Sequence, residues 1–301
     1  MSANFIDIAD YNSAALRDIL LLAHKMKSGV ISPTPLLGKT TAMIFEKSST
    51  RTRISFEVGI KQLGGTPLVL TSSDMQLSRG ETIGDTAKVL SRYVDAVMIR
   101  ALSHETVLQL AENAEIPVIN GLTNLSHPCQ IMADIMTIEE EFDSIDGLII
   151  AWFGDSNNVL KSWIDAAVTF PFSLRIASPK GYRPDKSVID KALDLGAQIS
   201  FYEDSLEAAA NANVLVTDVW ISMGDEVGTR LQDLRPYQVN KEVLECADDK
   251  AIFLHCLPAV RGNEVTAEVI DGSKSRVFDE AENRLHAQKA ILCYLFGDTI
   301  L

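Results

Sequence analysis

Short apolar runs alternate with helix-length segments along the whole chain. In the first half, these runs predict strands at Thr41–Phe45, Leu68–Leu70, Ala96–Ile99 and Val118–Ile119. In the second half, they predict strands at Leu148–Phe153, Leu174–Ala177, Ile199–Tyr202, Val214–Val219 and Ile252–Leu257. Alternation of strand and helix is typical of a parallel sheet covered by helices. The pattern therefore predicts an α/β fold with two doubly wound parallel sheets.

Two long helices complete this organisation. Apolar positions at helical spacing from Ile131 to Phe142 predict a helix over His127–Phe142, which we interpret as the bridge between two domains. A closing helix over Asp279–Leu295 has no strand after it and can dock on either domain. We expect it to return to the first, so that residues 1–141 and 280–301 form one domain and residues 146–279 the other. The length of 301 residues also favours two domains, because one hydrophobic core rarely fills so long a chain.

The charge balance limits the possible partners. There are 27 Lys and Arg residues against 41 Asp and Glu residues, giving a net charge of -14. Such a field repels nucleic acids and anionic membranes, so we expect neither as a partner. Any anionic ligand must therefore be bound by a local cluster of donors.

The cysteines and the hydropathy pattern favour a soluble protein in a reducing compartment. The four cysteines, Cys129, Cys246, Cys256 and Cys293, form no Cys-x-x-Cys pair and no finger-like spacing with histidines, so neither a disulfide framework nor a metal site is expected. No apolar run reaches the ~18 residues that span a bilayer, and the first residues lack a signal-peptide pattern. We expect a cytoplasmic protein.

The strongest candidate for chemistry follows the first strand. Parallel sheets bind ligands beyond the carboxyl ends of their strands. There, Ser48–Arg53 combines hydroxyls and arginines with a predicted helix amino terminus, which together make a phosphate site without a glycine loop. An isolated Ser-Thr pair would be an ordinary N-cap, but its position and the arginines favour an anion site. The nearby Gly38-Lys39-Thr40 is not a P-loop, because the required first glycine would fall at Pro33.

Further polar residues lie at other strand ends of the first half. Arg100 ends a strand and would point into the same crevice, although a surface salt bridge is the alternative. His127 and Gln130 lie one turn apart at the start of the bridging helix. A single histidine is more often a capping or core residue, but beside the hydroxyl cluster it becomes a candidate for polarising a carbonyl.

The second half carries its own set of candidate residues. The segment Gly154–Asn158 lacks the second and third glycines of a dinucleotide fingerprint, so a nicotinamide cofactor is not expected. Asp218 is followed by a long loop from Trp220 to about Asn240, and loops of this length are usually functional. Cys256 could be a nucleophile, but no third member of a triad is evident and buried cysteines are common. Arg284, taken alone, would be a solvated charge.

Taken together and in their order along the chain, these motifs resemble those of the aspartate and ornithine carbamoyltransferase family. Ser49-Thr50-Arg51-Thr52 and His127-Pro128-Cys129-Gln130 match patterns shared across that family, which binds carbamoyl phosphate with them. Asp218–Gly224 and His255–Pro258 resemble the ornithine branch, whereas aspartate transcarbamoylases carry another loop and usually a proline at the position of Cys256. The resemblance therefore names ornithine as the expected acceptor.

The resemblance also implies the site residues. Those expected to bind carbamoyl phosphate are Ser49, Thr50, Arg51, Thr52, Gln76, Arg100, His127, Gln130, Leu257 (through its carbonyl) and Arg284. Those expected to contact ornithine are Asn158, Asp218, Ser222, Met223 and Cys256. Thr52, Arg100 and His127 would stabilise the oxyanion, and Cys256 would lie near the attacking amine. The family further implies a cis peptide at Leu257-Pro258, and a homotrimer in which Gln76 reaches a neighbour's active site.

The implied reaction is direct attack of the ornithine side-chain amine on carbamoyl phosphate, which gives L-citrulline and phosphate in arginine metabolism. It needs no metal and no organic cofactor. Two alternatives remain open at this point: the same chemistry on another amine, such as an acylated ornithine, putrescine or aspartate, and a non-catalytic sensor of phosphate compounds on the same fold.

Overall fold

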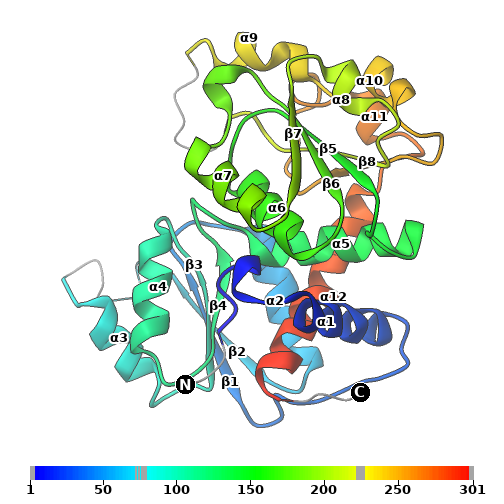
Figure 1. The fold of residues 1–301 in the computed structure, drawn as a ribbon. Helices are drawn as coiled ribbons and strands as arrows, with labels where there is room; N and C mark the ends of the chain where they lie inside the picture. The colour runs from blue at the N-terminus through cyan, green and yellow to red at the C-terminus, as the bar shows by residue number, and fades with distance from the viewer. Residues whose placement is uncertain (1–3, 72, 74, 76–79, 222–227, 298–301) are drawn as a thin grey trace. The chain divides into compact units, whose positions relative to one another are not determined.

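The computed structural model describes residues 4–71, 73, 75, 80–221 and 228–297. The chain forms two compact units: unit 1 comprises Met1–Met136 and Glu282–Leu301, and unit 2 comprises Thr137–Ala281 (Figure 1). Two helices, α5 (Pro128–Phe142) and α12 (Val277–Leu295), cross this division. The end of the chain thus returns to the unit in which the chain began.

Unit 1 contains a four-stranded parallel sheet in the order β2-β1-β3-β4. Its strands are β1 (Thr40–Phe45), β2 (Thr66–Thr71), β3 (Ala96–Arg100) and β4 (Val118–Leu122). Its other helices are η1 (Ile8–Asp10), α1 (Ser13–Lys27), α2 (Thr50–Gln62), α3 (Ile83–Leu90) and α4 (His104–Asn113). Helices α3 and α4 cover one face, and α1, α2 and the unit 1 part of α12 lie on the other (Figure 1). Both faces are therefore apolar: Ile44 and Val97 pack toward α3 and α4, and Met43 and Met98 are also fully buried.

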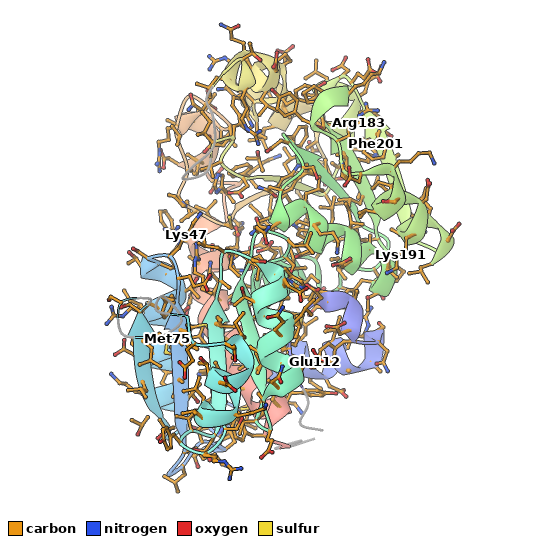
Figure 2. The ribbon with its side chains drawn as sticks, turned by 90° about the vertical axis from the view of Figure 1, so that its left-hand side faces the viewer. Lys47, Met75, Glu112, Arg183, Lys191 and Phe201 are labelled. Atoms are coloured by element: carbon orange, nitrogen blue, oxygen red, sulfur yellow. The ribbon has the colours of Figure 1, made fainter. Side chains whose placement is uncertain are left out.

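Unit 2 contains a five-stranded parallel sheet in the order β7-β6-β5-β8-β9. Its strands are β5 (Ile149–Phe153), β6 (Ser173–Ala177), β7 (Gln198–Tyr202), β8 (Val214–Thr217) and β9 (Ile252–His255). Its helices are α6 (Asn158–Thr169), η4 (Lys180–Tyr182), α7 (Lys186–Asp194), α8 (Ser205–Ala209), α9 (Arg230–Leu234), η5 (Arg235–Tyr237), α10 (Lys241–Cys246) and α11 (Ala267–Ile270). At β7, the guanidinium carbon of Arg183 lies 5.0 Å from the centroid of the Phe201 ring in a cation–π contact (Figure 2).

Strand order determines where each sheet opens. In unit 1, the order reverses between β1 and β3, and in unit 2 it reverses between β5 and β8. The loops leaving the carboxyl ends of two such strands diverge to opposite faces and leave a crevice between them. Residues after β1 and β3, and after β5 and β8, are thus placed to bind ligands.

The predicted fold class is confirmed, because both sheets are parallel and helices lie on both faces. Each predicted strand is present, but two end earlier than expected. Strand β8 ends at Thr217, where the Asp218 carboxylate accepts from the N-H of Val219, and β9 ends at His255, because Leu257 has a φ of 56° that no strand adopts. The expected long loop after Trp220 is also partly wrong, since α9 and η5 form within it.

None of the helices in the described ranges combines the length and apolar character that a bilayer span requires.

Candidate active site

The amino terminus of α2 lies directly after β1, at the opening of the unit 1 sheet. Ser49 caps this helix, and its Oγ accepts a hydrogen bond from the N-H of Thr52 at 3.3 Å. The remaining first-turn N-H groups and the positive end of the helix dipole point out of the helix here. This geometry suits a phosphate group.

Two arginines donate hydrogen bonds to the Thr52 side chain. Its Oγ1 accepts from Nη1 of Arg100 at 3.2 Å and from Nη2 of Arg284 at 2.7 Å, and its side chain is fully buried. The same Nη1 of Arg100 also donates to Ser49 Oγ at 3.2 Å. Two guanidinium groups on one hydroxyl repel each other, so this cluster favours an anion beside it.

A second set of bonds orients Gln130. Nη1 of Arg284 donates to Gln130 Oε1 at 2.7 Å, and Gln130 Nε2 donates to Asp134 Oδ1 at 2.8 Å. Because Arg284 is only 3% exposed, the interpretation as a solvated charge is wrong. The local sequence around Arg284 does not reveal this burial, since Gln130 lies 154 positions away, and only the family resemblance had placed both residues at one site.

His127 is buried immediately before α5. Burial lowers the pKa of its imidazole well below the usual range. The positive charges of Arg284, Arg100 and Arg51 lower this pKa further. A neutral imidazole at physiological pH can donate to a carbonyl oxygen without adding a further charge to the cluster.

A cavity of about 740 Å³ opens beside the α2 amino terminus. Its lining is Phe45, Glu46, Ser48, Ser49, Thr50, Arg53, Ile54, Glu57, Val69, Thr71 and Ser73. Ser49 and Thr50, both expected to bind phosphate, thus border an open volume that also has apolar walls.

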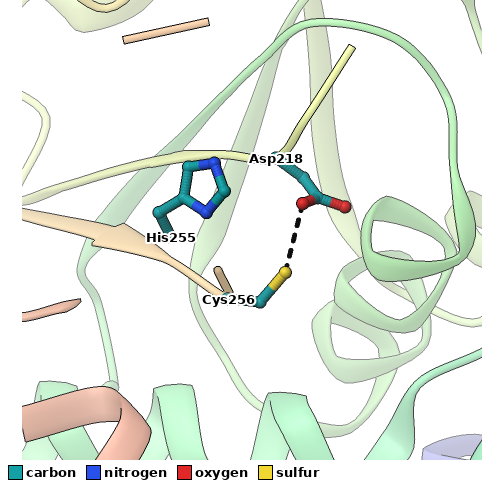
Figure 3. Close-up of side chains that lie close together, drawn as sticks. All are labelled: Asp218, His255 and Cys256. Atoms are coloured by element: carbon teal, nitrogen blue, oxygen red, sulfur yellow. Dashed lines mark hydrogen bonds between the residues drawn. The ribbon is translucent and has the colours of Figure 1, made fainter. Parts of the chain in front are cut away.

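In unit 2, a carboxylate lies at the sheet opening. Asp218 follows β8, and its Oδ2 accepts from Asn157 Nδ2 at 2.7 Å. Its Oδ1 accepts from the N-H of Val219 at 2.8 Å. The same oxygen accepts from the Cys256 thiol at 3.2 Å (Figure 3). These described partners are all neutral, so they orient the carboxylate without cancelling its charge.

Asn157 is a residue that sequence reasoning missed. We expected Asn158 to be the functional asparagine, and it is the first residue of α6. Its neighbour Asn157 bonds Asp218 through Nδ2 and caps α6 through Oδ1, which accepts from the N-H groups of Val159 and Leu160. The available signal was its position immediately before a helix, where asparagine is a preferred cap.

A second missed residue is Arg230, at the start of α9. It donates to the carbonyl of Trp220 and to the carboxylate of Asp155, which follows β5. It therefore ties the chain after β8 to the loop after β5. Nothing in its local sequence distinguishes it from an exposed helix arginine.

Asp218, His255 and Cys256 also have potential metal-ligand atoms within 4.8 Å of one another. Both ring nitrogens of His255 are already engaged, however. Nδ1 accepts from the N-H of Leu257 at 2.9 Å, and Nε2 lies 3.3 Å from Glu264 Oε1. A thiol and one carboxylate remain, which is fewer than the three protein ligands of a typical zinc site.

The expected cis peptide at Leu257-Pro258 is present. Three of the expected ligand-binding residues, Gln76, Ser222 and Met223, lie outside the described residues. The structure thus brings Ser49, Thr52, Arg100, Gln130 and Arg284 together in unit 1. It brings Asp218 and Cys256 together in unit 2.

Comparison with known proteins matches each half of the chain to a family domain. Residues 3–140 match the family domain described as the carbamoyl-P binding domain of aspartate/ornithine carbamoyltransferase, and residues 146–295 match its Asp/Orn binding domain. An ornithine carbamoyltransferase of Nitrobacter winogradskyi is 54% identical over 299 residues, which cover 98% of this chain and 97% of that protein.

The chain belongs to the aspartate/ornithine carbamoyltransferase family. A further member, the ornithine carbamoyltransferase of Brucella abortus, is 55% identical over 300 residues, which cover 98% of this chain and 96% of that one. The solved structure of the family's ornithine carbamoyltransferase from Pyrococcus furiosus superposes with a TM-score of 0.94 at 46% identity, covering 99% of this chain and 98% of that chain. The resemblance drawn from the motifs is thereby confirmed.

Proposed function

We propose that this chain is an ornithine carbamoyltransferase, which transfers the carbamoyl group of carbamoyl phosphate to the side-chain amine of L-ornithine. The products are L-citrulline and phosphate. Relatives that match nearly the full length carry the name of this activity. The observation that carries the proposal is Thr52, buried at the amino terminus of α2 and shared by Arg100 and Arg284.

Unit 1 is proposed to bind the donor. Ser49, Thr50, Arg51 and the N-H groups of α2 would bind the phosphate, a dianion that the two guanidinium groups on Thr52 attract. Gln130 and His127 would contact the carbamoyl part. Because Arg284 and Asp134 fix both ends of the Gln130 amide, that amide is already oriented before ligand binds.

Oxyanion stabilisation is proposed for Thr52, Arg100 and His127. When the amine attacks, negative charge develops on the carbamoyl oxygen, and donors already fixed in place stabilise it without reorganising. A neutral His127 supplies one such donor. The backbone carbonyl of Leu257 would accept from the carbamoyl amide.

Unit 2 is proposed to bind the acceptor. The described partners of the Asp218 carboxylate are neutral donors, so this side chain suits the α-ammonium group of ornithine. Cys256 lies 3.2 Å from this carboxylate and would be near the incoming amine. Asn158, Ser222 and Met223 complete the set of residues proposed from the family motif.

The attacking amine must be neutral. An alkyl amine with a pKa near ~10 is almost wholly protonated at pH 7, so the rate should rise above neutral pH, and the leaving phosphate can take the proton released on attack. No metal or organic cofactor enters this reaction.

A homotrimer with shared active sites is proposed for the assembly, with Gln76 completing a neighbour's site. Exposed apolar side chains on α2 and on the edge strand β2, namely Ile54, Val58 and Leu68, support burial against another copy. We also propose a cytoplasmic location. All four cysteines lie in the described part of the chain and none forms a disulfide, as in reducing compartments.

The test is citrulline formation from carbamoyl phosphate and L-ornithine, compared with an Arg51→Ala variant. Citrulline from the wild type, with at least ~100-fold loss in the variant, is the expected result, because a missing phosphate donor weakens binding of the dianion. Acylated ornithines, putrescine and aspartate are assayed in parallel. Turnover only with one of those amines would reject ornithine as acceptor, and binding of carbamoyl phosphate without turnover of any amine would favour a sensor.

A further inference from the structure

A buried carboxylate lies behind the loop that carries Cys256 and Leu257. Glu264 is 0% exposed, and its Oε1 lies 3.3 Å from Nε2 of His255. The same Oε1 accepts from the N-H of Val260. One carboxylate oxygen therefore contacts both ends of the segment from His255 to Val260.

The geometry determines which nitrogen of His255 carries the proton. Nδ1 accepts from the N-H of Leu257 at 2.9 Å, and a nitrogen that accepts an N-H bond cannot itself be protonated. The proton of the neutral ring is therefore on Nε2, from which it is donated to Glu264. Glu264 thus selects the tautomer whose other nitrogen is free to bind the Leu257 N-H.

The Leu257 backbone needs such support. Its φ of 56° lies in the left-handed region, which a leucine occupies only when surrounding contacts require it. The bond from its N-H to His255 Nδ1 is one such contact. A second anchor lies two residues earlier, in the backbone of His255 itself, because the N-H of His255 donates to Glu280 Oε2 at 2.8 Å.

Glu264 lowers the stability of the fold if it has no role besides packing. Its second oxygen, Oε2, is buried and has no hydrogen-bond partner within the described ranges. A buried carboxylate with an unsatisfied oxygen lowers stability relative to an apolar side chain of similar volume. The bonds of Oε1 therefore point to a role in placing the loop.

We infer that Glu264 is a positioning residue for carbamoyl transfer. Through His255 it sets the direction of the Leu257 carbonyl and the location of the Cys256 thiol beside Asp218. The inference deepens the proposed function and rests on it. Glu264 touches no reacting atom in this account, and it acts only through the loop.

The test compares Glu264→Gln with Glu264→Leu. The Gln amide oxygen can still accept both bonds, so kcat should stay within ~5-fold of wild type, whereas Leu removes the acceptor and should lower kcat by about 30- to 100-fold. Because the proposed phosphate site lies in unit 1, the Kd for inorganic phosphate should not change in either variant. Arg261→Ala is the control, since it breaks an exposed pair with Asp271 in the same region without touching Glu264.

A purely structural role is distinguished by two further readouts. Glu264→Gln places an amide N-H₂ where Oε2 has no partner, so its thermal midpoint should fall although kcat is kept. In a His255→Asn background, the Asn side chain can bond the Leu257 N-H by itself, so Glu264→Leu should then cost less than ~3-fold. Equal losses in both backgrounds, or a folded Glu264→Leu with wild-type kcat, would overturn the inference.

If Glu264→Leu does not fold, two variants of His255 test the inference instead. His255→Asn should retain at least ~10-fold more kcat than His255→Leu, because only Asn keeps an acceptor for the Leu257 N-H. Equal kcat in His255→Asn and His255→Leu would reject the proposed positioning of Leu257 through His255. A wild-type protein that forms no citrulline would instead reject the proposed function, and the positioning role with it.

Discussion

The two candidate sites are assembled in opposite ways. In unit 1, Arg100 and Arg284 come from distant parts of the sequence and interlock on Thr52, so positive charges are held by neutral hydroxyl and amide oxygens. In unit 2, a single carboxylate, Asp218, is held by the neutral donors Asn157 and Cys256. In each unit the described hydrogen bonds orient the charged group, which suits a ligand of opposite sign, a phosphate in one case and an ammonium in the other.

The largest expected effect is that of Arg284→Ala. It removes the buried Arg284 donor from Gln130 Oε1 and one of the two donors to Thr52 Oγ1, so stability should fall by about 2–3 kcal/mol. Lost phosphate and oxyanion stabilisation should lower kcat/KM for carbamoyl phosphate by about 10³-fold. Steady-state kinetics and urea unfolding measure the two losses. Lys61→Ala, which removes an exposed pair on α2, is the control and should change kcat/KM less than ~2-fold.

Asp218→Asn should come next, and it tests whether the two sites are chemically separate. Loss of the only carboxylate proposed for ornithine should lower kcat/KM for ornithine by about 10²-fold, because a charge-assisted contact becomes a neutral one. The Kd for inorganic phosphate, measured by calorimetry, should not change. Weaker phosphate binding in this variant would contradict the assignment of phosphate to unit 1 and of ornithine to unit 2.

Asn157→Ala should have a smaller effect on the same site. It removes one bond to Asp218 and the cap of α6, so stability should fall by about 1–2 kcal/mol and kcat/KM for ornithine by about 10-fold. Asn240→Ala is a matched control, since Asn240 caps α10 in the same unit through Val243. Similar kinetic losses in both variants would show that capping, rather than the bond to Asp218, matters.

The smallest expected effect is a pH dependence of stability from His127. Its pKa is lowered in the folded protein, so below pH ~6.5 the unfolded chain binds a proton that the folded chain does not. The free energy of unfolding should therefore fall as the pH drops below ~6.5, by at most about 1.4 kcal/mol per pH unit from this group. His127→Gln should flatten that part of the curve, measured by urea unfolding at pH 5.5 and 7. An unchanged slope would mean that His127 is not held neutral by burial in the cationic cluster.

The sequence was sufficient to predict the fold class and to select candidate residues for both sites. Continuous apolar runs predicted parallel strands, and in parallel sheets the carboxyl ends of the strands form the ligand crevice, so residues such as Ser49, Arg100 and Asp218 could be selected by position. The motifs then identified the family. Each of these inferences depends on local pattern, which periodicity and order along the chain record directly.

Only the tertiary structure decided which side chains meet. Arg284 would be a solvated charge by its local sequence, but the return of α12 to unit 1 buries it against Gln130 and Thr52. Asn157, which the sequence had not singled out, bonds Asp218, because the cap geometry of α6 turns that side chain toward the strand end. Glu264 had no sequence signal at all. Periodicity reports which positions are buried, but partners that lie far apart in sequence are chosen by how the packed elements bring them together.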